Sequence, residues 1–138
     1  MTYSDFLTNV EEALLRVIAS NTMLHEYNIN RWDSDKEVKL PRVNVELDAT
    51  RDVEHSPLFR IGVIITLEGK PRRQKLSGAQ YELESLMGDD ALCPMLQLHT
   101  DKVFYYGNAA EQIRIQRRID GDIRKLVLSC NIYAGPQV

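Results

Sequence analysis

Cysteine is scarce in this sequence. Only Cys93 and Cys130 are present, and they lie in different segments without CxxC spacing or a surrounding group of histidines. This pattern argues against both a zinc site and a disulfide framework, so we expect two reduced thiols. A chain of 138 residues can bury a hydrophobic core that is stable without a metal or a disulfide, so we expect no cofactor.

Long apolar runs and an excess of positive charge are missing as well. No apolar run approaches the length of a membrane span, which is about 20 residues. The stretch MTYSDFLTNVEEALLRVIA places acidic residues among apolar ones and lacks the continuous apolar core of a secretory signal. Lysine and arginine number 17 against 20 aspartates and glutamates, a net charge of −3. We therefore expect synthesis in the cytoplasm, no membrane partner and no general binding of nucleic acid.

Familiar catalytic motifs are absent too. The sequence contains no HExxH, GxSxG, P-loop or Rossmann glycine pattern, which would supply metal ligands, a nucleophile or phosphate-binding amides. Each histidine lies near an acidic residue that would allow a histidine–carboxylate pair: His25 near Glu26, His55 near Glu54, and His99 near Asp101. Solvated surface histidines explain these pairs more simply. Asp33, Asp35 and Glu37 resemble the start of a calcium loop, but its glycine turn and closing glutamate are missing. We expect neither enzymatic activity nor a metal site.

The remaining composition is that of an ordinary globular domain. Hydrophobic residues make up 43% of the 138 residues and charged residues 27%, unlike the profile of a disordered chain. One hydrophobic core commonly serves about 50 to 200 residues. No internal repeat or linker divides the sequence, so we expect a single domain over residues 1–138.

Two segments have helical periodicity. Over residues 4–19 the apolar side chains recur at the spacing of one helix face. A second helix is predicted from Ser77, which has capping-box spacing to Gln80, through Met87. Gly88, followed by two aspartates, ends this helix.

Four other segments alternate as strands do. Residues 43–47 place apolar side chains on one face only. Residues 58–68 carry apolar side chains on both faces, which predicts a central strand that is covered on both sides. The chain closes with residues 113–119 and 126–132, joined through an Asp-Gly turn. Arg117 occupies an inward position, which predicts a bulge or an edge strand there.

The order of these elements predicts an α+β fold. It runs helix, two strands, helix and two or three strands, without the βαβαβ rhythm of a doubly wound parallel sheet. The simplest architecture is an antiparallel or mixed β-sheet of four to five strands with two helices packed on one face. The segment ALCPMLQL (91–98) stays open, because Pro94 can either begin or break a helical turn.

Charged residues gather in three places. The link 49–57 is longer and more charged than a hairpin turn requires, and we expect it to project from the body. Residues 70–75 carry four basic side chains and suit either an exposed loop or an interface. Five basic residues crowd the C-terminal hairpin, where cross-strand ion pairs or a subunit interface would explain them: Arg114, Arg117, Arg118, Arg124 and Lys125.

Nearly the whole chain is covered by these elements in sequence: the helix DFLTNVEEALLRVIA, the extended pair PRVNVEL and LFRIGVIITLEG, the helix SGAQYELESLM, and the strands EQIRIQRRID and IRKLVLSCNIYAG. This arrangement resembles the tail terminator family of long-tailed bacteriophages, which are tail-completion or neck proteins. The resemblance is architectural. It implies a structural protein of the virion, a hexameric ring that ends the tail tube. The implied partners are further copies of the chain, the tail tube protein and a head-completion protein.

Candidate residues for subunit interfaces lie in the charged segments and on the central strand: Arg51, Asp52, Glu54, Gly62, Ile64, Arg72, Arg73, Arg117 and Arg118. A tail tube or head–tail connector component would also form rings through its sheet, and would differ in whether the rings stack. Two other classes stay open. One is a small hydrolase or nuclease that uses a histidine–carboxylate pair and the basic run, and the other is a small-ligand binding module.

Overall fold

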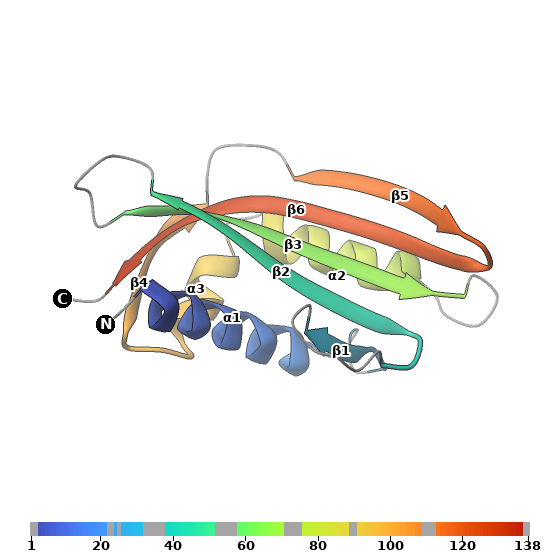
Figure 1. Cartoon of the computed structure of the whole chain (residues 1–138), viewed down its shortest axis with the longest axis horizontal. Helices are drawn as coiled ribbons and strands as arrows, with labels where there is room; N and C mark the ends of the chain where they lie inside the picture. The colour runs from blue at the N-terminus through green and yellow to red at the C-terminus, as the bar shows by residue number, and fades with distance from the viewer. Residues whose placement is uncertain are drawn as a thin grey trace.

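Figure 1 shows a computed structural model of the chain, which describes residues 3–21, 24, 26–31, 38–51, 58–70, 76–88, 91–108 and 113–136. Within these ranges the chain forms three helices and six strands. In chain order they are α1 (Tyr3–Ser20), β1 (Asn28–Arg31), β2 (Arg42–Arg51), β3 (Phe59–Gly69), α2 (Leu76–Gly88), α3 (Leu92–Gln97), β4 (Val103–Asn108), β5 (Arg114–Asp120) and β6 (Ile123–Pro136).

All six strands belong to one mixed sheet. Its order is β1-β2-β3-β6-β4, and β5 also pairs with β6. Only β1 and β2 run parallel, and every other pair is antiparallel. One edge of the long strand β6 pairs with β3, while its other edge is shared: β5 pairs with residues 123–129 and β4 with residues 132–136. The α+β class and the mixed sheet are as the sequence predicts.

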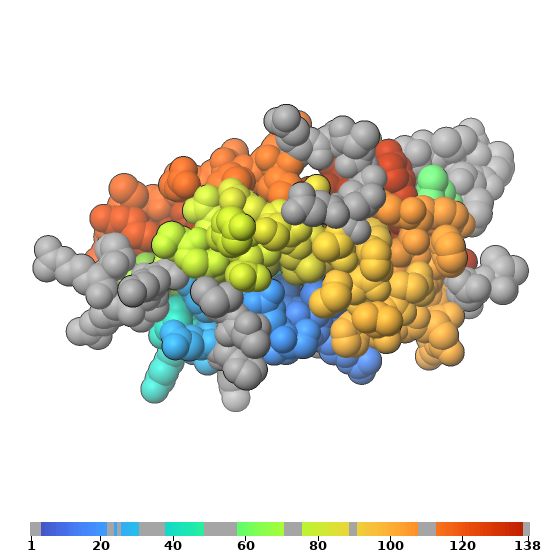
Figure 2. All heavy atoms as spheres, turned by 180° about the vertical axis from the view of Figure 1, so that it is seen from behind, coloured from blue at the N-terminus to red at the C-terminus, as the bar shows by residue number. Residues whose placement is uncertain are grey.

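The three helices lie on the same face of the sheet (Figure 1). Figure 2 views the molecule from the opposite side to Figure 1, with the helices toward the reader. One buried cluster joins them to the strands, because alternate side chains of β2, β3 and β6 point toward the helices. Phe6 of α1 and Phe59 of β3 illustrate the contact, with ring centroids 5.0 Å apart. The core therefore fills one side of the sheet only.

Both predicted helices are confirmed. In α1 the apolar stripe includes Phe6, Val10 and Leu14, all at most 1% exposed, so packing on β2 holds the helix in place. The second helix begins at Leu76, so Ser77 lies within its first turn, and the capping-box interpretation is wrong. Gln80 instead donates a hydrogen bond to Glu84 Oε1 at 3.1 Å.

The open segment 91–98 forms the short helix α3. Pro94 is its third residue, a position in the first turn where a backbone N–H has no partner within the helix. The next residue already closes a helical turn, since the Met95 N–H donates to the Ala91 carbonyl at 3.3 Å. Leu92, Cys93 and Leu96 are buried against the sheet.

Two strands were not predicted. The strand β1 has only four residues, Asn28–Arg31, and two of them are asparagines, so its sequence has no strand periodicity. In β4, Val103 and Tyr105 are buried while Phe104 and Tyr106 are exposed. Apolar and aromatic residues occupy both faces of β4, so the pattern hides the alternation. These two strands raise the sheet from the expected four or five strands to six.

Candidate assembly interface

One face of the sheet carries none of the helices in the described part of the chain. We call it the open face. The sequence predicts that β3 is central and covered on both sides; its central position is confirmed, but only one side is covered by helices. The side chains of β3 that point to the open face are half-buried from Arg60 to Thr66, while those facing the helices are buried. Within the described ranges, no helix therefore lies on the second face of β3, which the sequence predicts to be covered.

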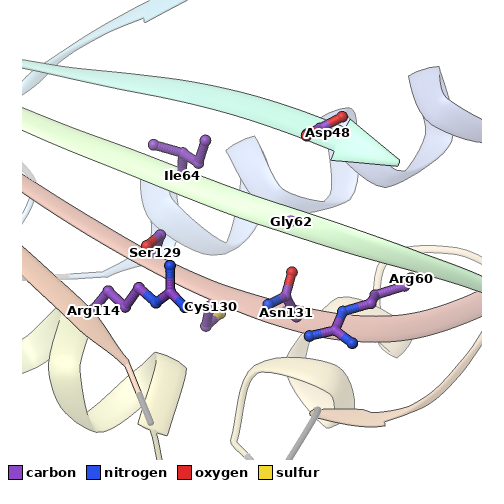
Figure 3. Close-up of a pocket in the computed structure, with 8 residues that line it drawn as sticks. All are labelled: Asp48, Arg60, Gly62, Ile64, Arg114, Ser129, Cys130 and Asn131. Atoms are coloured by element: carbon purple, nitrogen blue, oxygen red, sulfur yellow. The ribbon is translucent and has the colours of Figure 1, made fainter. Parts of the chain in front are cut away.

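The open face contains a depression of about 400 Å³, shown in Figure 3. It lies over β2, β3 and β6. Gly62 forms the floor, opposite Asp48 on β2 and Asn131 on β6. A Cβ atom at Gly62 would lie 3.4 Å from the Asp48 carbonyl oxygen and 3.5 Å from Asn131 Oδ1. The missing side chain is therefore what hollows the sheet at this point.

The rim of the depression carries charges of both signs. Asp48 is exposed at one side, and the guanidinium groups of Arg60 and Arg114 lie at the other (Figure 3). Ile64 supplies an apolar wall, in register with Ser129 of β6. A surface with this layout can receive a small side chain from another protein in the hollow, while its charged rim selects the orientation.

A buried ionic cluster borders the depression on the same face. Glu68 is 5% exposed and is the only charged side chain that is buried within the described ranges. Its carboxylate accepts hydrogen bonds from Arg42 Nε at 3.2 Å and Arg42 Nη2 at 2.7 Å, and from Asn44 Nδ2. Lys125 Nζ lies 3.9 Å from the same carboxylate. Asn30 continues the chain of bonds by donating to Asn44, so the cluster connects β1, β2, β3 and β6.

Exposed aromatic residues stand on β4. Phe104 and Tyr106 are 45% and 57% exposed, and their rings meet edge to face with centroids 4.8 Å apart. They project away from the core, because Val103 and Tyr105 occupy the opposite, buried positions. Aromatic side chains are enriched in the centres of protein interfaces, where they bury a large area at a small cost in side-chain entropy.

The structure separates the residues that the sequence selects as interface candidates. Gly62 and Ile64 lie together at the depression. Arg117 and Arg118 lie on β5, whose seven residues are all exposed. This confirms the edge-strand interpretation of Arg117, and the regular register of β5 contains no bulge. Arg51 is the last residue of β2, opposite Phe59. The remaining candidates fall outside the described residues: Asp52, Glu54, Arg72 and Arg73.

Several residues of the depression have no counterpart among the sequence candidates, namely Asp48, Arg60, Ser129 and Asn131, whereas Arg114 belongs to the basic hairpin residues for which the sequence left a subunit interface open. Arg60, Ser129 and Asn131 lie within strands that the sequence predicts, and Asp48 directly follows one. The alternation of those strands was therefore the available signal. The alternation does not reveal the register of the strands, which brings residues from β2, β3 and β6 side by side.

The described residues offer little for catalysis. His99 is half-buried, while His25 and His55 lie outside the described ranges, as do Asp33, Asp35 and Glu37. No group of three or more metal-ligating side chains occurs in the part of the chain that the structure describes. Both cysteines are buried and neither forms a disulfide, and burial raises the pKa of the Cys130 thiol to about 11. Cys130 is therefore protonated and unreactive at neutral pH.

Comparison with protein-family models and with the sequences of curated proteins gives no match. No protein-family model matches the chain, and no curated protein is similar to it in sequence. None of the described helices is both long and apolar enough to cross a membrane.

Proposed function

We propose that this chain is a structural subunit of a long-tailed phage virion, which assembles through its open face into a ring that ends the tail tube and docks head-completion proteins. The observation that carries the proposal is the open face itself. It combines a depression, a rim of both charges and an exposed aromatic pair, and no described helix covers it. The architectural resemblance to tail terminator proteins supplies the biological context.

The composition of the open face suits contact with protein. A solvated sheet face usually alternates polar residues with the buried ones. Here Ile64 and Phe104 occupy outward positions, beside the charges of Arg60 and Asp48. In a cyclic ring each contact joins different patches of identical subunits. Opposite charges on one rim can set the register of such a contact and disfavour wrong partners.

The first experiment measures the assembly of the unmodified protein. Light scattering over a concentration series should give a mass that rises to a defined multiple of the 15.9 kDa chain, and negative-stain images should show closed rings. Rings that stack into tubes would assign the chain to the tail tube or connector instead. A monomer at every concentration would contradict self-assembly.

Two variants test whether the open face is the surface involved. Gly62→Glu fills the depression with a charged side chain, and Ile64→Asp places a charge on its apolar wall. Both should lower the solution mass or the melting temperature. Arg16→Glu on the exposed side of α1 is the matched control, because it reverses a charge on the helical layer. An unchanged oligomer and melting temperature in both open-face variants would refute the role of this surface.

A further inference from the structure

A second depression lies on the other side of the sheet, between α2 and the β5–β6 hairpin. It has a volume of about 480 Å³. Figure 2 shows this side of the molecule, where α2 lies next to β5. We call it the hairpin groove. Ser77 and Gln80 of α2 form one wall, while Arg117 and Ile119 of β5 and Arg124 of β6 form the other.

Three arginines of the hairpin groove have no carboxylate partner among the described residues. Arg117 donates to Gln80 Oε1 at 3.3 Å, Arg118 to Gln116 Oε1 at 3.0 Å, and Arg124 to the Gly121 carbonyl at 3.4 Å. The hairpin acids pair elsewhere, because Asp120 lies 3.6 Å from Lys125 and Asp122 lies 3.5 Å from Lys70. Cross-strand ion pairing therefore accounts for Lys125. The three arginines have no acidic partner among the described residues.

Two of these arginines are oriented by hydrogen bonds within the fold. Arg117 is held toward α2 by its bond to Gln80, and Gln80 is itself anchored to Glu84. Arg124 is held by the hairpin turn. A guanidinium that is already oriented loses less entropy when it binds a carboxylate, and its planar shape suits two parallel hydrogen bonds. The groove is thus prepared for carboxylates.

Apolar surface accompanies this charge. Ile119 is 71% exposed at the groove, and Leu126 forms part of the floor. A phosphate group would bind the arginines but would leave the side chain of Ile119 exposed to solvent. Single-stranded nucleic acid would require aromatic side chains for stacking, and none of the described residues that line the groove is aromatic. Acidic residues combined with an apolar side chain match both features, and they occur together in protein segments.

We infer that the hairpin groove binds an acidic segment of a partner protein, whose carboxylates pair with Arg117 and Arg124 and whose apolar side chain packs on Ile119. This goes beyond the proposed function, because the groove lies on the helical side and none of its described lining residues also lines the depression of the open face. Self-association and partner binding then use different surfaces.

The test uses fluorescence anisotropy with three labelled peptides of equal length and the full chain. The first alternates glutamate and leucine, the second glutamate and serine, and the third lysine and leucine. The glutamate–leucine peptide should bind saturably and more tightly than the glutamate–serine peptide, while the lysine–leucine peptide should not bind. No saturable binding of either acidic peptide, or tighter binding of a single-stranded oligonucleotide, would overturn the inference.

Variants locate the binding. Arg117→Gln and Arg124→Gln should each lower the affinity for the glutamate–leucine peptide about fivefold, as expected for loss of one charged pair. Ile119→Ser should lower the affinity for that peptide but leave the affinity for the glutamate–serine peptide unchanged. Arg114→Gln is the matched control, because Arg114 lies on the same strand but lines the open face. Equal weakening by Arg114→Gln would mean a general charge effect and would overturn the assignment to the groove.

Peptide binding in the hairpin groove should be independent of ring formation. All these positions are exposed on β5 or partly exposed at the hairpin, so the variants should keep the melting temperature of the unmodified chain. Light scattering on the groove variants should give the same mass as the unmodified chain. If peptide binding is lost while the mass is kept, the groove is a separate docking surface. If the mass falls together with peptide binding, the groove belongs to the self-association surface and the inference fails.

Discussion

The guanidinium of Arg42 gives two hydrogen bonds to one carboxylate oxygen of Glu68, at 3.2 and 2.7 Å. Both side chains are nearly buried, with 11% and 7% of their surfaces exposed. They are direct neighbours across β2 and β3. A buried charge of this kind is tolerated only with its partner, so the pair should fix the register of the two strands at this end of the sheet.

Removal of one partner should be costly. Glu68→Leu leaves the buried guanidinium without its carboxylate and should reduce the free energy of unfolding by about 3 kcal/mol. The double variant Arg42→Met with Glu68→Leu should recover much of that loss, because no unpaired charge from this pair remains. Urea denaturation of the single and double variants measures the coupling. Losses that simply add would show that the two side chains are not energetically coupled.

The turn of the β5–β6 hairpin should depend on glycine. Gly121 has a φ of +63°, in the left-handed region that side chains with a Cβ disfavour. Gly121→Ala should lower the free energy of unfolding by about 1 kcal/mol, and Gly121→Asn should cost less, because asparagine tolerates this conformation. Thermal unfolding of the two variants tests the order. Since nothing lies within 4 Å of the added Cβ, a steric clash would not explain a loss.

The hydroxyl of Tyr105 is predicted to contribute nothing to stability at neutral pH. It is buried and has no hydrogen-bond partner in the described structure. Tyr105→Phe removes this unsatisfied group and keeps the ring, so the unfolding free energy should stay the same or rise by up to about 1 kcal/mol. Tyr105→Leu, which changes the shape of the packed ring, is the control and should destabilise. A clear loss in Tyr105→Phe would mean that the hydroxyl has a partner.

Alkaline pH should weaken the fold through Cys130. Burial raises the pKa of this thiol from 9.0 to about 11, so the folded chain keeps a proton that the unfolded chain releases. Stability from this group is complete below pH 9 and falls as the pH rises toward 11, by about 2 kcal/mol. Cys130→Ala should show a smaller decline between these pH values in urea denaturation. Parallel curves for the two proteins would contradict the assignment.

The sequence was most informative where one face of an element is buried. The helical stripe of Phe6 and Val10 and the alternation of Val43 and Val45 predict α1 and β2, because each pattern follows directly from burial on one side. It was less informative for β1, which is short and polar, and for β4, where aromatic residues occupy both faces. These strands form because neighbouring strands offer them hydrogen-bond partners, and that is a property of the assembled sheet.

The open face could not be predicted in the same way. The apolar residues on both sides of β3 suggest a covered strand, but local periodicity does not say on which side the helices pack. The burial of Glu68 was likewise hidden, since its partner Arg42 lies 26 residues away in the chain. Long-range register decides both features.

The position of β6 also bears on how the protein is made. This strand pairs with β3, β4 and β5, yet it follows all of them in the chain. None of those pairings can form until residues 123–136 have emerged from the ribosome, so the sheet should close late, after synthesis of the other elements. Until then β3 exposes an unpaired edge of apolar residues, a state in which binding by a chaperone would protect the nascent chain from aggregation.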